Sequence, residues 1–165
     1  MVEIEMGRSG RPGLAALEAS DAALVERLFD RLSPESIYRR FFSPITSAEH
    51  FTRLVLREDA LDRAAVAAVE DGELVGVAQY SRRPGADEAD LAVMVADAWQ
   101  RQGLGTRLVA ALADRARGQG IERFAVDVQG DNYGSQRLLR RVAPGLRLTF
   151  SGGVGEGEFS IQGAS

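Results

Sequence analysis

The chain has 165 residues, of which 45% are hydrophobic and 27% charged, and its formal net charge is −4. These values are ordinary for a soluble globular protein, and the length suits one domain with a core of its own. We therefore expect a single domain over residues 1–165, with residues 1–12 as its flexible part. The acidic balance argues against general binding to nucleic acid, and no apolar run reaches the length of a membrane span.

The residue types that are missing narrow the chemistry further. The chain has no Cys, which excludes disulfides, thiolate metal sites and a cysteine nucleophile. Its single histidine, His50, cannot build a multi-histidine metal centre, and we expect it to be a solvated surface residue, with no metal site in the protein. Residues 1–5 lack the features of a secretion signal, so we expect a cytoplasmic location.

The first third of the chain is predicted to form strands followed by helices. A weak alternation over residues 2–6 and a glycine-rich loop precede an expected main strand at 14–18. Three helices follow, and each begins after residues that favour a helix N-terminus. We expect them at 22–32 after Ser20 and Asp21, at 37–42 after Ser33-Pro34, and at 48–57 after Thr46 or Ser47.

The middle of the chain is predicted to be a meander of three strands. Asp71-Gly72 separates an Ala/Val-rich run that begins at Ala64 from a second apolar run at 74–81. An Asp-Gly pair between two such runs is a strong hairpin signal, because both residues tolerate positive φ. A further turn at 82–87 leads to a third strand at 88–95.

The last part of the chain alternates helices and strands. We expect a helix at 104–117, a strand at 123–128 and a helix at 132–141. A closing antiparallel pair is expected at 146–151 and 158–162, joined by a glycine-rich loop over 152–157. The whole order is a mixed α/β pattern.

A glycine turn, Gln100-Arg101-Gln102-Gly103-Leu104-Gly105-Thr106, lies between an expected strand and an expected helix. Such a turn exposes consecutive backbone N–H groups beside the positive end of a helix dipole, and its glycines let phosphates approach the main chain closely. The spacing alone is weak evidence in a chain with 18 Gly. Its position between the two elements predicts an anion cradle that suits a pyrophosphate.

The motif and the order of elements resemble the GNAT superfamily of acyl-CoA N-acyltransferases across nearly the whole chain. The resemblance implies a mostly antiparallel sheet that splays between its fourth and fifth strands, with acetyl-CoA as co-substrate and its pyrophosphate on the glycine turn. It also implies that the pantetheine arm contacts the main chain of Val93, Met94 and Val95, and that Asn132 touches the cofactor. A helix N-cap is the alternative role for Asn132.

Asp90 is the candidate general base. Alternation places it with Glu88 on one face of the 88–95 strand, where a carboxylate interrupts apolar residues. A lysine-like amine has a pKa of about 10.4, so it must lose a proton before it attacks a thioester. Partial burial would raise the pKa of Asp90 toward the useful range. Glu88 is the reserve base, and an ion pair with Arg82 or Arg83 is the alternative role for Asp90.

Two segments, 32–42 and 89–92, resemble bacterial protein lysine acetyltransferases that modify acyl-CoA synthetases. Those enzymes have a catalytic Glu where Asp90 stands. Many GNAT enzymes also carry a Tyr that protonates the leaving thiolate, at the position of Leu139. No tyrosine is assigned to that role here, because thiols with a pKa near 8.5 are tolerable leaving groups. The cluster Arg137, Arg140 and Arg141 either reaches the cofactor phosphates or forms a solvated face.

These observations predict an enzyme that binds acetyl-CoA and an amine together and transfers the acetyl group directly. A protein lysine is the favoured acceptor and a small-molecule amine the alternative, with residues 33–57 as the acceptor wall. A non-catalytic acyl-CoA-binding module and a nucleotide-binding domain are the rival classes. We expect no nucleic-acid or membrane partner, and the sequence leaves monomer and homodimer open.

Overall fold

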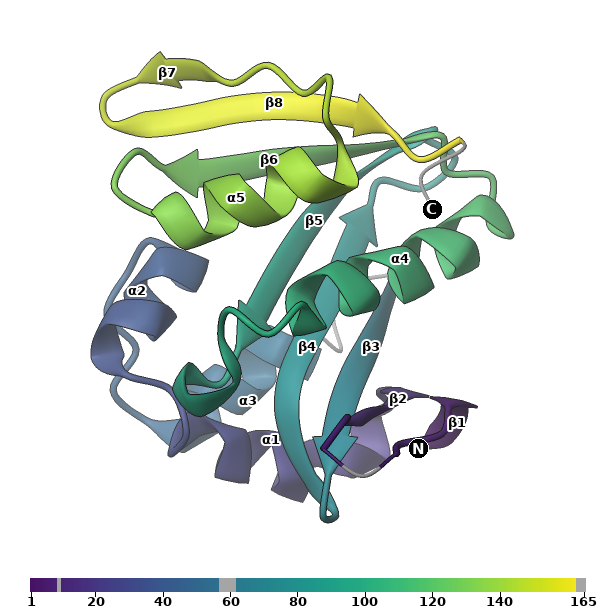
Figure 1. Cartoon of the computed structure of the whole chain (residues 1–165), viewed down its shortest axis with the longest axis vertical. Helices are drawn as coiled ribbons and strands as arrows, with labels where there is room; N and C mark the ends of the chain where they lie inside the picture. The colour runs from purple at the N-terminus through teal and green to yellow at the C-terminus, as the bar shows by residue number, and fades with distance from the viewer. Residues whose placement is uncertain (9, 57–61, 163–165) are drawn as a thin grey trace.

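A computed structural model describes residues 1–8, 10–56 and 62–162 of the chain. These residues form one eight-stranded sheet with helices on both faces (Figure 1). In chain order the elements are β1 (Val2–Glu5), β2 (Gly13–Ala16), α1 (Ala22–Phe29), α2 (Pro34–Phe41), α3 (Ala48–Leu56), β3 (Arg63–Glu70), β4 (Glu73–Arg82), β5 (Glu88–Val95), α4 (Leu104–Arg117), β6 (Arg123–Gln129), α5 (Tyr133–Val142), β7 (Thr149–Ser151) and β8 (Val154–Ser160). Short 3-10 turns precede α1 and follow β5.

The three N-terminal helices begin where their caps predict. Ser33 Oγ accepts a hydrogen bond from Ser36 N at 3.1 Å, and Pro34 is the first residue of α2. Ser47 Oγ does the same for His50 N at 3.0 Å, ahead of α3. The first helix ends at Phe29, earlier than expected. Residue 57, the expected end of the third helix, lies outside the described residues.

The structure confirms the predicted meander of three strands in the middle of the chain. Asp71 and Gly72 both adopt positive φ, 51° and 75°, so β3 and β4 are joined by a tight hairpin. Strand β5 then pairs with β4 from Ala89 to Val95, and its bounds are the predicted ones. The full strand order is β1-β2-β3-β4-β5-β6-β8-β7.

The sheet opens between β5 and β6. These two strands run parallel, and they pair only from Glu88 with Arg123 to Asp90 with Ala125. Beyond that point β5 continues beside β4, whereas β6 continues beside β8, so the two strands diverge. The mixed α/β fold with a splay between these strands is therefore confirmed; they are the fourth and fifth strands when counting starts at β2.

The C-terminal pair has a shorter first strand and a longer second strand than the sequence predicts. Strand β8 begins at Val154 rather than 158, β7 is confined to Thr149–Ser151, and β8 lies between β6 and β7. Only Gly152 and Gly153 make the turn, with φ of 59° and 80°. Gly155 belongs to the strand because the Phe150 ring lies against its backbone, where a Cβ would meet a ring carbon at 2.8 Å. The prediction was wrong here because it took glycine as a sign of a loop.

Helices cover the two faces of the sheet differently. Helix α4 packs on β3, β4 and β5, while α1 packs on β4 from the other face together with α3 (Figure 1). Gly76 of β4 faces α4, where a Cβ would meet Leu108 at 3.0 Å. Because Gly76 pairs with Val95, the odd-numbered residues of β5 share that face, and Asp90, Ala92 and Met94 lie on the α1–α3 face. No helix among the described residues has the length and apolarity to cross a membrane.

Candidate active site

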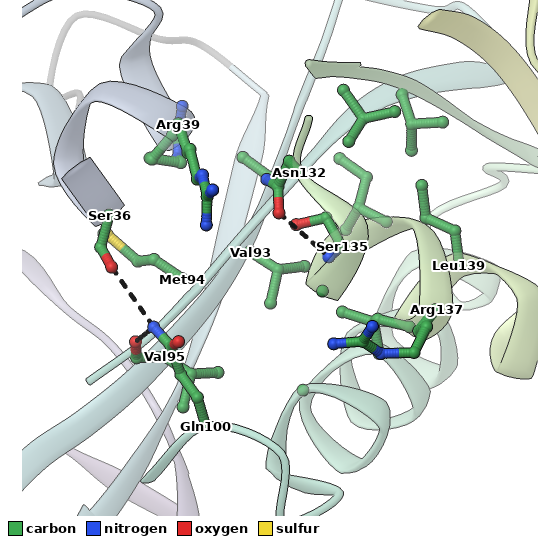
Figure 2. A pocket seen from close by; sticks show the side chains of 18 of the residues that line it. Ser36, Arg39, Val93, Met94, Val95, Gln100, Asn132, Ser135, Arg137 and Leu139 are labelled. Atoms are coloured by element: carbon green, nitrogen blue, oxygen red, sulfur yellow. Dashed lines mark hydrogen bonds between the residues drawn. The ribbon is translucent and has the colours of Figure 1, made fainter. Parts of the chain in front are cut away.

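The opening between β5 and β6 is the base of a cleft of about 910 Å³. Helix α2 lines one side of the cleft, and the N-terminal ends of α4 and α5 line the other (Figure 2). Residues of seven different elements and of the turn before α4 therefore meet at one place. Of the predicted site residues, the cleft is lined by Asp90, Val93, Met94, Val95, Gln100, Arg101, Gly103, Leu104, Gly105, Thr106 and Asn132.

The turn before α4 has the geometry of an anion cradle. Arg101 and Gly103 both adopt left-handed backbone conformations, with φ of 64° and 80°, and the helix begins at the next residue. Gly103, the N-cap residue, has no side chain that could cap this helix, so the N–H groups of its first turn face the cleft without a capping acceptor from that position. Gly105 serves another purpose, because a Cβ there would meet Leu138 of α5 at 3.0 Å. The start of α4 can therefore approach the middle of α5 closely.

The two glutamines of the turn behave differently. Gln100 Nε2 donates to Val95 O at 3.0 Å and lies 3.3 Å from Ser36 Oγ, so it joins the turn to β5 and α2 (Figure 2). Gln102 is not among the lining residues, and its Nε2 donates to Ala98 O at 3.2 Å, within the same turn. The side chain of Gln102 thus stiffens the loop that holds the cradle.

The main chain of β5 offers polar groups to the opening between the strands. Ala96 N donates to Val75 O, toward β4. Because main-chain groups alternate between the two edges of a strand, those of Met94 also point to β4, and those of Val93 and Val95 point to the opening. Val95 O already accepts from Gln100, which leaves the N–H and C=O of Val93 and the N–H of Val95 facing the cleft. Met94 contributes its side chain instead, toward α2 (Figure 2).

Asn132 caps α5 and also lines the cleft. It is 8% exposed, and its Oδ1 accepts from Ser135 N at 3.1 Å, which makes it the N-cap of α5. This bond engages the oxygen, so the amide nitrogen remains to donate into the cleft (Figure 2). Leu139 also lines the cleft and is buried, at the position where a tyrosine acid was considered. Tyr133 lines the mouth and is 66% exposed.

The two candidate bases lie in different surroundings. Asp90 lines the cleft on the α2 face of β5, but it is exposed rather than partly buried. Glu88 is not among the lining residues; its carboxylate lies 3.5 Å from Arg123 Nε. It also raises the pKa of Glu158 through a shared hydrogen bond and charge repulsion. The geometry therefore brings only Asp90 to the cleft.

Helix α2 supplies residues that the sequence motifs did not single out. Asp97 Oδ1 accepts from Ser33 N and from Ser36 Oγ, both at 3.0 Å, and so ties the start of α2 to the end of β5. This places the following turn of the helix, with Arg39 and Arg40, along the cleft. Of the segment 33–57, which the sequence predicts to be the acceptor wall, α2 lines the cleft and no described residue of α3 does. The capping pattern at Ser33 was the signal in the sequence.

The remaining candidates divide between cleft and surface. Arg137 and Arg141 of α5 line the cleft, whereas Arg140 is not among the lining residues. His50 is exposed, as predicted. Among the described residues no group of acidic or histidine side chains is arranged to hold a metal ion.

Comparisons with known proteins fit this geometry. Residues 26–143 match the model of the Acetyltransferase (GNAT) family. The chain is 33% identical over 131 residues to the aminoglycoside N(6')-acetyltransferase type 1 of Klebsiella aerogenes, covering 75% of this chain and 83% of that one. The chain belongs to the GNAT family of acetyltransferases.

Solved structures agree over almost the full length. The GNAT domain of S. lividans PAT superposes with a TM-score of 0.81 at 29% identity, covering 96% of each chain. The Salmonella typhimurium protein yncA, solved with its cofactor acetyl-CoA, has a TM-score of 0.68 at 17% identity, covering 91% of this chain and 94% of that one. The second likeness supports the fold alone.

Proposed function

We propose that this enzyme transfers an acetyl group from acetyl-CoA directly to an amine, with Asp90 as the general base. The observation that carries the proposal is the cleft itself. An uncapped helix N-terminus, the main chain of Val93 and the carboxylate of Asp90 all border one continuous space.

The residues of the cleft suit the parts of acetyl-CoA. The first-turn N–H groups of α4 would bind the pyrophosphate, with Arg101, Arg137 and Arg141 as further cations at that end. The pantetheine arm would lie in the opening between β5 and β6, hydrogen-bonded to Val93 in the way that an added strand uses a sheet edge. The Val93 N–H would then also stabilise the negative charge that develops on the thioester oxygen.

The transfer step needs one proton acceptor. The amine nitrogen forms a bond to the acetyl carbon while the carbon–sulfur bond breaks, and the electron pair of that bond leaves with the sulfur of CoA. Asp90 accepts the proton from the amine, either directly or through water, and the thiolate leaves without a dedicated acid because Leu139 has no proton to give. The exposure of Asp90 lets solvent carry that proton away.

Two acceptor classes have support from relatives. The likeness to S. lividans PAT, together with the segments 32–42 and 89–92, favours a protein lysine. The aminoglycoside acetyltransferase of K. aerogenes favours a small amine. The open cleft is compatible with both kinds of molecule.

Replacing the carboxylate of Asp90 tests the base assignment. We expect Asp90→Asn to bind acetyl-CoA as the wild type does in calorimetry, while kcat for CoA release in the presence of an amine falls about 100-fold, within the range for general bases. Asp90→Glu should keep most of the activity, since it retains the carboxylate. Asp71→Asn is the matched control, because Asp71 lies in the β3–β4 turn, where asparagine tolerates positive φ equally well. Unchanged turnover in Asp90→Asn would refute the assignment. Binding of acetyl-CoA without turnover by the wild type would favour the non-catalytic module.

A further inference from the structure

The start of α5 stands at the open end of the gap between β5 and β6. The parallel pairing ends at Asp90 with Ala125, and the same register continued along the strands brings Val93 level with Val128. Strand β6 ends one residue further on, and α5 begins four residues after that end. The first turn of α5, with Ser135, therefore borders the gap at the level of Val93 (Figure 2).

The side chain of Ser135 is turned to this gap. It lines the cleft together with Asn132, three residues earlier, and Leu139, four residues later, so the three share one face of the helix. The Ser135 N–H donates to Asn132 Oδ1 at 3.1 Å. The Ser135 hydroxyl, in contrast, has no hydrogen bond to another residue among those that the structure describes. Serine hydroxyls often bond to nearby main-chain groups, so this one is available to a ligand.

Space for a ligand remains next to this hydroxyl. Gly134 precedes Ser135 and also lines the cleft. Apart from its chain neighbours and the backbone of its own helix, the nearest atom to a Cβ at Gly134 would be Asn132 Oδ1, at 3.9 Å. A larger side chain here would stand over the first turn of α5, and glycine leaves that approach open. An atom of a bound ligand can therefore reach the Ser135 hydroxyl from the cleft.

The sulfur of acetyl-CoA belongs on this side of the sheet under the proposed function. Asp90, and with it the incoming amine, lies on the α1–α3 face of β5. Helix α5 packs beside α4 on the opposite face, where a Cβ at Gly105 would meet Leu138 at 3.0 Å. Because the cradle at the start of α4 would hold the pyrophosphate, the pantetheine arm reaches the thioester from the α4–α5 side. The sulfur then departs toward α5 as the amine arrives from the other face.

We propose that Ser135 Oγ donates a hydrogen bond to the sulfur of CoA and stabilises the thiolate as it leaves. The inference rests on the proposed function and adds a catalytic residue to it. When the carbon–sulfur bond breaks, its electron pair stays on the sulfur and the Ser135 proton stays on Oγ; the thiolate takes up a proton from water afterwards. A hydrogen bond to an ionised acceptor is stronger than one to a neutral acceptor, so this contact favours the thiolate over the thioester.

The experiment measures the pKa of the CoA thiol in its complex with the protein. This chain has no Cys, so the thiol of CoA is the only one in the sample. Its thiolate is followed by ultraviolet absorbance against the same protein with desulfo-CoA. We expect the thiol pKa of CoA bound to the wild type to lie about one pH unit below that of CoA bound to Ser135→Ala, as one charge-assisted hydrogen bond predicts. Ser135→Thr keeps the hydroxyl and should keep the lower pKa. With any amine that the wild type acetylates, kcat of Ser135→Ala should fall about tenfold.

Ser135→Ala removes the hydroxyl and little else. Alanine keeps the main-chain N–H that donates to Asn132, so the cap of α5 persists. Ser151→Ala is the matched control, because Ser151 is an exposed serine of β7 that is not among the lining residues. This control should leave the thiol pKa unchanged. Every variant keeps the charged groups that line this part of the cleft, which are Asp127, Asp131 and Arg137.

Binding of desulfo-CoA separates the sulfur from the rest of the ligand. In calorimetry, Ser135→Ala should bind desulfo-CoA with the Kd of the wild type. Weaker binding of desulfo-CoA together with an unchanged thiol pKa would mean that the hydroxyl contacts the pantetheine arm instead, and the inference would be wrong. It would be equally wrong if the thiol pKa were the same in the wild type and Ser135→Ala. In both cases CoA is bound and the acetyltransferase proposal stands. If the wild type binds neither CoA nor desulfo-CoA, both proposals fail.

Discussion

The side chain of Gln100 donates to the main-chain oxygen of Val95 at 3.0 Å, across the corner where β5 turns into the anion cradle. The bond satisfies a carbonyl group that faces the opening between β5 and β6. It also brings the same amide nitrogen to 3.3 Å from Ser36 Oγ on α2. One side chain thus connects the turn before α4 with strand β5 and helix α2.

Removing this connection should weaken the binding of acetyl-CoA. For Gln100→Ala we expect the Kd in calorimetry to rise about fivefold, because one hydrogen bond contributes ~1 kcal/mol. Gln102→Ala is the matched control, since its side chain bonds within the turn and does not reach the cleft. Equal losses in both variants would mean that the effect comes from general loosening of the turn.

The left-handed backbone at Gly103 allows a second prediction. Its φ is 80° and nothing lies within 4 Å of the place where a Cβ would be, so Gly103→Ala introduces backbone strain without a clash. We expect a loss of about 1–2 kcal/mol in the free energy of unfolding, measured by urea denaturation. Gly103→Asn should recover part of it, because asparagine visits this region more readily.

A glycine without a left-handed backbone, Gly145, provides the comparison. Gly145 also has open space around its Cβ position, and its φ is not in the left-handed region. Gly145→Ala should therefore leave the free energy of unfolding unchanged or slightly higher. If Gly103→Ala is as stable as Gly145→Ala, the strained turn does not persist in solution.

Local sequence signals predicted the parts of the fold that are set by neighbouring residues. The caps at Ser33 and Ser47, the Asp71-Gly72 hairpin and the bounds of β5 all depend on backbone preferences within a few positions. The start of β8 was missed because Gly155 is required by the Phe150 ring, a contact that forms only after the strands pair. The sequence alone does not distinguish a glycine that makes a turn from one that leaves room for a neighbouring side chain.

The residues of the site also fall into two groups, those that local sequence patterns predict and those that depend on how distant elements pack. The cradle and Asp90 could be located from motif and strand alternation, because each is a local pattern. The pairing of Glu88 with Arg123 and the position of Arg39 depend on how β6 and α2 pack on β5, and no local pattern contains that information. The arginines of α2 were therefore indistinguishable, in the sequence, from a solvated helix face.

The charge cluster at the closed end of the strands gives a prediction on pH. The hydrogen bond with Glu88 and its negative charge raise the pKa of Glu158, and desolvation adds to this, while Arg123 opposes it. A carboxyl whose pKa is higher in the folded state stabilises the fold when it is protonated. That contribution is present below the pKa of the unfolded chain and is lost as the pH rises through the folded pKa. Removing the charge at neutral pH should therefore stabilise the protein.

For Glu158→Gln we expect a melting temperature about 1–2 °C above that of the wild type at pH 7, a small gain because both carboxylates are partly exposed. The gain should shrink toward zero as the pH falls below the ordinary range of glutamate, because the raised pKa of Glu158 keeps its carboxyl protonated there in the wild type. Scanning calorimetry at pH 4 and pH 7 measures both values. Glu26→Gln, an exposed change on α1, should not show this pH-dependent gain. A lower melting temperature for Glu158→Gln at pH 7 would mean that attraction to Arg123 outweighs the repulsion between the two glutamates.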